Sequence, residues 1–186
     1  ALRCARLLMT KARSGDSRCT AAHLRAITEL CRSSDPSAQI DLPGGLLAHR
    51  EYDLLVLEKR GPEPAAEEAA LPMPGAIVWG RWSISCRQES YSGQKNTPWE
   101  FWLDGAVSGL TVDCRRTGDI LAPQGRHTKS LKRWLIEEKV PARQRDSLPV
   151  FRWEQRVAAV GGLGPDRAAA AGGPGPAWHI QITPVK

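Results

Sequence analysis

Cationic side chains between residues 115 and 145 are the part of the sequence best suited to bind a charged ligand. Nine Lys and Arg residues lie in this span against three carboxylates, an excess equal to the formal net charge of +6 of the whole chain. A localised cationic surface attracts a polyanion through counterion release, which an evenly charged surface does much less. Nucleic acid is therefore the leading partner class, and the candidate RNA-binding residues are Arg115, Arg116, Lys129, Lys132, Arg133, Lys139, Arg143 and Arg145.

Patterns that would suggest catalysis each have a simpler explanation. Ser92 and Lys95 have the Ser-x-x-Lys spacing of some acyl-transfer enzymes, but they lie in a polar turn without companion motifs. Segment 13–18, RSGDSR, has only part of a pyrophosphate-binding loop and joins two predicted helices. The four His residues are dispersed, and none has a partner at metal-ligand spacing. We therefore predict no catalytic residue, no metal site and no cofactor within this chain.

Composition indicates a folded protein without a membrane partner. Hydrophobic residues make up 41% of the 186 residues, and seven are Trp, which excludes wholesale disorder. The five Cys residues include no Cys-x-x-Cys pair, so the sequence favours reduced thiols over a disulfide framework or a zinc knuckle. No apolar run approaches the roughly 18 residues that span a bilayer. A cytoplasmic protein fits these features.

The N-terminal part, residues 1–60, is predicted to begin with helices and to end with a hairpin. Residues 1–33 show helical spacing of apolar residues, with a polar break at 13–18 and Thr20 as the cap of a second helix. Residues 40–59 then indicate two strands around a turn. The candidate turns are Gly44–Gly45 and His49–Glu51.

The C-terminal part, residues 75–186, is predicted to be a separate α+β domain. Residues 61–74 are rich in Pro, Ala and Glu and are interpreted as a linker, with a short acidic helix as the alternative. Strand patterns occupy 76–88, 99–107, 109–116, 148–162 and 177–185. Strands joined by short turns form antiparallel sheets, so the predicted fold class is a mainly antiparallel sheet with one basic amphipathic helix, preceded by a short helical segment.

The single helix of this region lies within residues 125–141. At about 100° per residue, its cationic and apolar side chains fall on opposite faces. A solvated surface is the ordinary explanation for one cationic helix face, and the density of cations around it favours a ligand. The predicted cationic face comprises Lys129, Lys132 and Arg133, and the predicted core face comprises Leu131, Trp134 and Leu135.

Tryptophans interleaved with cations can stack on unpaired bases, as in proteins that bind single strands. Most of them lie in strand-like segments of this chain, where burial in a core is the expected outcome. Burial is predicted for Trp79, Trp82, Trp99, Trp102 and Trp153, whereas Trp178 is the candidate for an exposed ring.

An ordered set of short motifs between residues 115 and 150 resembles the C-terminal domain of tRNA(Ile)-lysidine synthase. The set comprises RRTGD at 115–119, PxG at 123–125, KxLK at 129–132, EKVP at 138–141, RD at 145–146 and LPV at 148–150. Upstream, TAAHLRAITEL and DLPGGLLAHREYDLLVL are similar to the segment that joins the middle domain of that family to the C-terminal one. The resemblance covers residues 20–163, with 61–74 and 164–186 matched least.

The resemblance implies a role in tRNA modification. Enzymes of this family are ATP-dependent ligases that adenylate the wobble cytidine of the isoleucine tRNA with a CAU anticodon, after which lysine displaces AMP to give lysidine. Their catalytic domain, with its ATP and Mg²⁺, lies at the N-terminus, and the printed sequence has no equivalent of it. The C-terminal domain contacts the tRNA acceptor stem and resembles a domain of the phenylalanyl-tRNA synthetase β chain. The implied partners are this tRNA and the catalytic domain of the same enzyme.

The residues themselves suit a reader of a double-stranded stem, which presents two phosphate rows and a shallow minor groove. Asp119 is predicted to be a loop or cap acceptor, since a carboxylate would repel phosphate. Gly118 and Gly125 are predicted to occupy turns. Arg145 either extends the basic surface or forms an ion pair with Asp146. The alternative function is a protein-interaction or structural domain whose nonspecific basic surface meets an acidic partner.

Overall fold

The described part of the first unit contains one helix and a three-stranded antiparallel sheet. In the computed structural model, which describes residues 20–35, 38–51, 54–59 and 66–185, the chain divides into the units Ala1–Pro62 and Glu63–Lys186. Helix α2 (Ala21–Arg32) begins after Thr20, as predicted, and buries Ile27 and Leu30. The strands are β1 (Gln39–Leu42), β2 (Leu46–Glu51) and β3 (Leu54–Lys59), in that order. The predicted second strand is therefore itself a hairpin, and the helix predicted within 1–19 lies outside the described residues.

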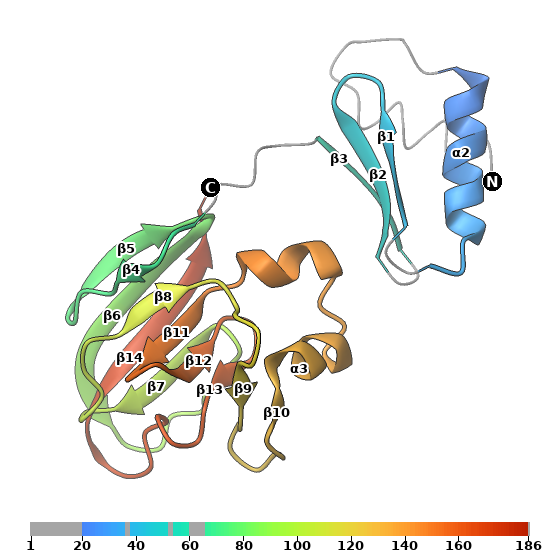
Figure 1. Cartoon of the computed structure of the whole chain (residues 1–186). Coiled ribbons are helices and arrows are strands. Elements are labelled where there is room, and N and C mark those ends of the chain that lie inside the picture. Colours follow the sequence, from blue (N-terminus) through green and yellow to red (C-terminus); the bar gives the residue numbers. More distant parts are fainter. Residues whose placement is uncertain (1–19, 36–37, 52–53, 60–65, 186) are drawn as a thin grey trace. The chain divides into compact units, whose positions relative to one another are not determined.

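The second unit is built from two larger antiparallel sheets and one short ribbon (Figure 1). The four-stranded sheet has the order β5 (Gly75–Trp79), β6 (Trp82–Tyr91), β14 (Gly175–Pro184) and β7 (Glu100–Asp104). The five-stranded sheet has the order β13 (Gly164–Pro165), β12 (Arg156–Val160), β11 (Val150–Trp153), β8 (Thr111–Asp113) and β4 (Ala69–Ala70). The ribbon pairs β9 (Ile120–Leu121) with β10 (Lys129–Ser130). The predicted mainly antiparallel fold class is confirmed.

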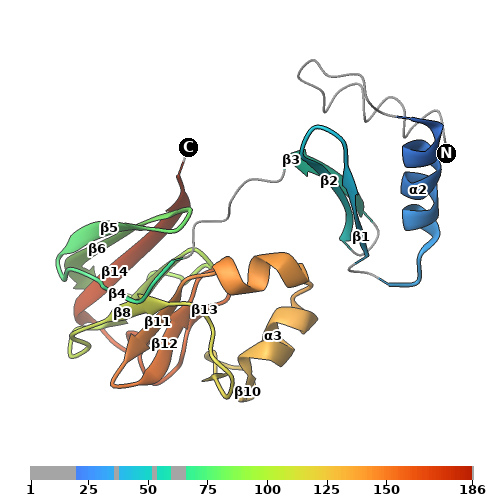
Figure 2. The same ribbon diagram turned by 45° about the horizontal axis from the view of Figure 1, so that its top comes forward.

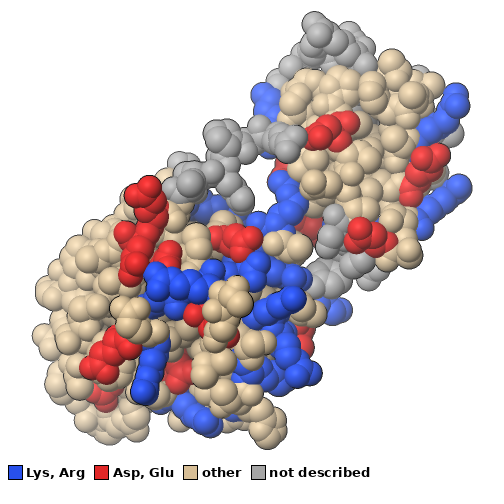
Figure 3. Space-filling model, viewed as in Figure 1, with Lys and Arg blue, Asp and Glu red and all other residues tan. Residues whose placement is uncertain are grey.

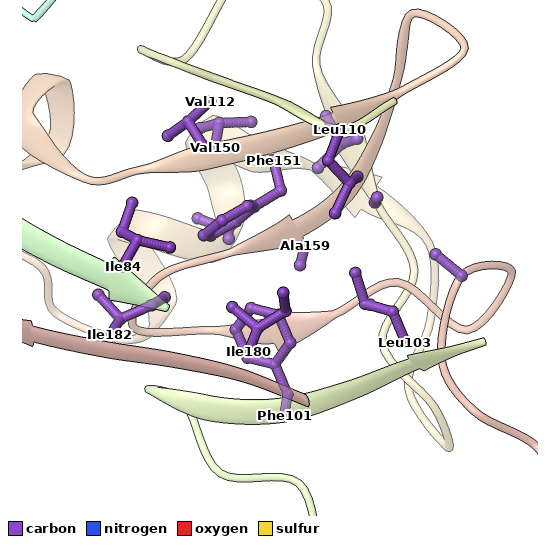
Figure 4. Packing of buried hydrophobic residues seen from close by; sticks show 14 of the residues in the cluster. Ile84, Phe101, Leu103, Leu110, Val112, Val150, Phe151, Ala159, Ile180 and Ile182 are labelled. Carbon is purple, nitrogen blue, oxygen red and sulfur yellow. The ribbon is translucent and has the colours of Figure 1, made fainter. Parts of the chain in front are cut away.

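The core of this unit lies between the two sheets, which form separate layers in Figure 2. Phe101 and Ile180 project from the four-stranded sheet, and Phe151 and Val112 project from the five-stranded sheet (Figure 4). Phe101 and Phe151 meet edge to face, with ring centroids 5.7 Å apart. All four of these side chains are fully buried. The alternation of apolar and polar residues in the strands thus supplies one face of each sheet to a common core.

The predicted linker differs from the structure over its described part. Ala69 and Ala70 form β4 and pair with β8, and Leu71 is 4% exposed in the core. The indole Nε1 of Trp79 donates a hydrogen bond of 2.8 Å to the carbonyl of Glu67. Residues 66–74 therefore belong to the second unit. Two residues with small side chains, Ala69 and Ala70, are enough to form the edge strand of the five-stranded sheet. A composition rich in Pro, Ala and Glu does not reveal this pairing.

Two segments predicted as single strands are hairpins. Residues 76–88 turn at Gly80, whose φ of 56° allows β5 to return directly as β6. Residues 148–162 turn at Glu154 and Gln155, which have φ of 47° and 66°. The left-handed conformation at these two non-glycine residues explains why the sequence gives no turn signal there.

The tryptophans are mostly buried, as predicted, with one correction. Trp79, Trp82 and Trp102 are 3 to 7% exposed. Trp99 and Trp153 are half-buried against the core. Trp178 was the candidate for exposure, but it is 9% exposed because its position in β14 directs it into the core with Ile180 and Ile182. None of the helices in the described part of the chain is long and apolar enough to cross a membrane.

Candidate nucleic-acid interface

The predicted basic helix is present and is anchored by its apolar face. Helix α3 (Leu131–Glu137) lies beside β9 and β10 (Figure 1), and Leu131, Trp134 and Leu135 are 1 to 2% exposed. The indole of Trp134 donates a hydrogen bond of 2.9 Å to the carbonyl of Leu121. The amide of Leu131 donates one of 2.8 Å to the carbonyl of Asp119. These contacts fix the direction in which the remaining side chains of α3 point.

Lys129 does not belong to the helix, which corrects the predicted cationic face. Ser130 is the N-cap, and its hydroxyl accepts a hydrogen bond of 3.4 Å from the amide of Arg133, so Lys129 lies in β10. Its Nζ is 2.6 Å from a carboxylate oxygen of Glu137 and 4.8 Å from the ring centroid of Trp134. The hydrogen bond from Lys129 holds the pKa of Glu137 below its ordinary value. Lys129 is thus already engaged by the helix that follows it.

Arg126 makes the same two kinds of contact as Lys129, with a carboxylate and with the ring of Trp134, and it was not among the predicted site residues. Its guanidinium is 2.8 Å from a carboxylate oxygen of Glu138 and lies 4.0 Å from the ring centroid of Trp134. Glu137 and Glu138 are therefore each held by a cation from outside α3. The nearest cation to each of these carboxylates is therefore Lys129 or Arg126, and not one of the other cations around the helix.

Three predicted residues remain exposed around α3, and we call them the α3 cations: Lys132, Arg133 and Lys139. None of the residues that the structure describes forms an ion pair with Lys132 or Lys139. Arg133 acts on Glu137 only through its longer-range field, which helps to lower the pKa of that carboxyl group. Lys139 follows the helix with a φ of 54°. Figure 3 shows Lys and Arg gathered on the face that carries α3, with Asp and Glu among them.

Arg115 and Arg116 are engaged by carboxylates from other parts of the fold. Arg115 Nε is 2.6 Å from an oxygen of Asp146. Arg116 Nη2 is 2.6 Å from Asp113 and 2.9 Å from Glu68, and its hydrogen bond to Asp113 raises its pKa. Both guanidinium groups therefore tie the loop after β8 to neighbouring segments. The side chains of Arg115 and Arg116 stay 32% and 45% exposed, next to the carboxylates with which they pair.

Asp119 is a loop acceptor, as predicted, and its main partner is Arg152. Arg152 is 4% exposed and donates hydrogen bonds of 2.8 and 3.0 Å to the two oxygens of Asp119. The amide of Arg116 donates a further one of 2.6 Å. Burial by itself would raise the pKa of Asp119, but the hydrogen bonds from Arg152 and from this amide hold the pKa below its ordinary value. Arg152 was not among the predicted site residues, because it lies in an otherwise apolar strand.

The remaining predicted cations lie on the short helix η1 (Ala142–Ser147), a 3₁₀ helix. Arg143 is exposed, and Arg145 is half-buried, with its Nε donating a hydrogen bond of 2.9 Å to the carbonyl of Val140. The possible ion pair between Arg145 and Asp146 is not formed, because Asp146 pairs with Arg115. Pro141 was predicted to end the helix, but α3 ends at Glu137 with Glu138 as its C-cap, and Pro141 is instead the N-cap of η1. Gly118 and Gly125 have φ of 92° and 72°, which confirms their turn positions.

This architecture defines the class: a two-sheet antiparallel domain that presents cations from one short, anchored helix. Residues 110–182 match the family model of the TilS substrate C-terminal domain. The chain is also similar to a solved structure described as the TilS C-terminal domain, with a TM-score of 0.57 and 26% identity; the match covers 64% of this chain and 99% of that one. The resemblance to the C-terminal portion of tRNA(Ile)-lysidine synthase is thereby confirmed.

Full-length relatives extend the match beyond this domain. A tRNA(Ile)-lysidine synthase of Geobacillus kaustophilus is 34% identical over 142 residues, which cover 70% of this chain and 30% of the relative. A bifunctional TilS/HprT protein of Listeria monocytogenes is 32% identical over 137 residues, which cover 71% of this chain and 21% of the relative. The chain thus spans less than a third of the length of these relatives. The likeness to a phenylalanyl-tRNA synthetase domain stays a prediction.

Proposed function

We propose that this chain is the tRNA-binding C-terminal region of a tRNA(Ile)-lysidine synthase and that it docks the acceptor stem of the isoleucine tRNA with a CAU anticodon. The observation that carries the proposal is the exposure of the α3 cations beside a helix whose two carboxylates are held by Lys129 and Arg126. Lys132 and Lys139 have no carboxylate partner among the described residues, so an external anion can bind them without displacing one. The family resemblance supplies the identity of the RNA.

The geometry suits recognition of a backbone better than recognition of a base sequence. A stem of double-stranded RNA is recognised mainly by its shape and through its phosphates and 2′-hydroxyl groups. Lysine acts as a point charge towards phosphate, and arginine can donate two parallel hydrogen bonds. Because α3 is fixed to the core by Trp134 and its neighbours, the cations lose little backbone freedom when they bind.

In this proposal the chemistry takes place elsewhere in the parent enzyme. The catalytic domain uses ATP, Mg²⁺ and lysine to convert the wobble cytidine to lysidine in the cytoplasm, and this chain holds the tRNA for it. The described residues contain no group of three or more His, Cys, Asp or Glu residues that could hold a metal ion. They therefore do not fit the Mg²⁺ site, and we assign no catalytic step to them.

A charge-removal experiment tests which surface binds the RNA. The variant Lys132→Ala/Arg133→Ala removes two α3 cations, and Arg87→Ala/Lys95→Ala removes two exposed cations of β6 and the loop that follows it. We expect the first variant to weaken binding to the isoleucine tRNA and to flatten the dependence of log affinity on log salt by roughly one unit per lost phosphate contact. The second variant should bind like the wild type. Equal effects of the two variants would contradict the proposal.

A further inference from the structure

Ile136 is an exposed apolar residue on a helix that otherwise buries its apolar side chains. It is 45% exposed, whereas Leu131, Trp134 and Leu135 are 1 to 2% exposed. Ile136 does not belong to the hydrophobic core of the second unit, nor is it among the partly buried residues that pack against that core. A β-branched residue is also a weaker helix former than the Ala, Leu, Lys or Glu common at exposed positions. Neither packing nor helix propensity therefore accounts for Ile136.

The surroundings of Ile136 are cationic. On a helical surface its neighbours three and four residues away are Arg133 and Lys132, and Lys139 follows three residues later. Glu137 and Glu138 are drawn to Lys129 and Arg126. Ile136 is consequently an exposed apolar side chain with α3 cations before and after it in the sequence. Lys132 lies in the first turn of α3 and Lys139 follows its C-cap Glu138, so the two lysines lie at opposite ends of the helix.

An apolar side chain between cations is complementary to one surface of a nucleic acid, the minor groove of duplex RNA. In an RNA duplex, the wide and shallow minor groove exposes riboses between two rows of phosphates. An apolar side chain flanked by cations can contact the riboses while the cations reach the phosphates. The minor groove of B-DNA is about 6 Å wide and 7.5 Å deep. A helix about 10 to 12 Å in diameter cannot enter that groove to bring a short side chain to its floor.

We propose that Ile136 packs against riboses in the minor groove of an RNA duplex, with Lys132 and Lys139 on the phosphates at either side. This inference rests on the proposed tRNA-binding function and makes Ile136 a residue that distinguishes duplex RNA from duplex DNA. The contact is apolar and releases no counterion, so it contributes affinity without a salt dependence of its own. That property separates the role of Ile136 from that of the lysines.

The test compares Ile136→Ala with Lys132→Ala and with Val78→Ala as a matched control. Val78 is a β-branched residue of β5 that is 69% exposed and far in the sequence from α3. The full chain and each variant are titrated with an acceptor-stem RNA duplex and with a DNA duplex of the same sequence, across a salt series. Circular dichroism checks the fold, which an exposed Ile→Ala change on a helix should preserve.

We expect Ile136→Ala to weaken RNA binding about fivefold at every salt concentration with an unchanged salt slope, and to reduce the preference for RNA over DNA. Lys132→Ala should flatten the slope, and Val78→Ala should change neither quantity. Wild-type affinity of Ile136→Ala, together with weakened binding of Lys132→Ala, would overturn this inference and leave the proposed function standing. An equal loss on RNA and DNA would also overturn it. Failure of the wild type to bind RNA, with capture of an acidic protein instead, would overturn both proposals.

Discussion

At the scale of single residues, the contact between Asp119 and Arg152 determines how the basic surface is held. Asp119 lies in the loop before β9, and Arg152 lies in β11 of the five-stranded sheet. Two hydrogen bonds join their side chains, and Arg152 also donates one of 3.0 Å to the carbonyl of Cys114. The pair therefore connects the core to both ends of the loop that carries Arg115 and Arg116.

The variant Asp119→Asn is expected to lower the free energy of unfolding by about 3 kcal/mol, because Arg152 would keep its charge in a nearly dry position after losing its closest carboxylate. Only Asp113 would remain, with an oxygen 3.7 Å from the Nε of Arg152. The matched control is Asp146→Asn, which breaks the exposed ion pair with Arg115 and should cost less than about 1 kcal/mol. Chemical denaturation measures both values. Similar losses in the two variants would contradict the structural role of Arg152.

The contribution of Asp119 to the stability of the fold should depend on pH. The pKa of Asp119 is lower in the folded protein than its ordinary value of 3.8, so the carboxylate stabilises the fold fully above that value. Its contribution is lost as the pH falls below 3.8 through the lower folded pKa. The stability difference between wild type and Asp119→Asn should accordingly be constant near neutral pH and shrink in acid. Denaturation curves recorded between neutral pH and about pH 3 measure this difference, and a difference that grows in acid would contradict it.

The sequence could indicate which cations belong to the surface but could not show which of them have partners. Lys132 and Lys139 are exposed without ion pairs among the described residues, whereas Arg115 and Arg116 are paired. The paired carboxylates include Glu68 and Asp146, which lie far away in the sequence. Only the strand pairing of the folded sheets brings such groups together, and local charge patterns contain no record of it.

At the scale of elements, α3 depends on its neighbours for stability. A helix of seven residues is too short to persist alone in water, so the burial of its apolar face must hold it. The sequence located this helix and its core face correctly because both follow from local periodicity. Its start was misplaced because Ser130 takes the cap position, and the turn at Glu154 was missed because neither Gly nor Asn marks it.

Substitution by Ala at two neighbouring residues of α3 should change the stability of the fold by very different amounts. Leu135→Ala is expected to cost about 2 to 5 kcal/mol of unfolding free energy, since Leu135 is 1% exposed in the core. Ile136→Ala should change stability by no more than about 0.5 kcal/mol, since its side chain is largely exposed. Thermal and denaturant unfolding distinguish the two. A large stability loss for Ile136→Ala would mean that the side chain is part of the core.

At the scale of the whole molecule, the chain has two units with separate hydrophobic cores. One cluster includes Ile27 and Leu46 of the first unit, and the other contains the residues between the two sheets of the second unit. The composition of the sequence suggested a boundary near residue 75. Strand β4 and Leu71 place the start of the second unit earlier, because they complete its sheet and core.

Truncation tests this boundary. A fragment of residues 63–186 is expected to unfold cooperatively, since it keeps β4, Leu71 and the hydrogen bond between Trp79 and Glu67. A fragment of residues 75–186 should be less stable by several kcal/mol, because it loses a fully buried Leu and leaves the indole of Trp79 without its acceptor. Calorimetry on both fragments gives the comparison. Equal stability would show that residues 66–74 are dispensable after all.

The central claim concerns the whole molecule and the RNA that it binds. The measurement that tests it most directly is the affinity of the chain for the isoleucine tRNA, for its isolated acceptor-stem minihelix and for its anticodon stem-loop, each across a salt series. We predict that the minihelix retains most of the affinity of the full tRNA, that log affinity falls steeply with log salt, and that the anticodon stem-loop binds much more weakly. Equal and weak binding to all three RNAs would contradict the claim and leave only a nonspecific basic surface.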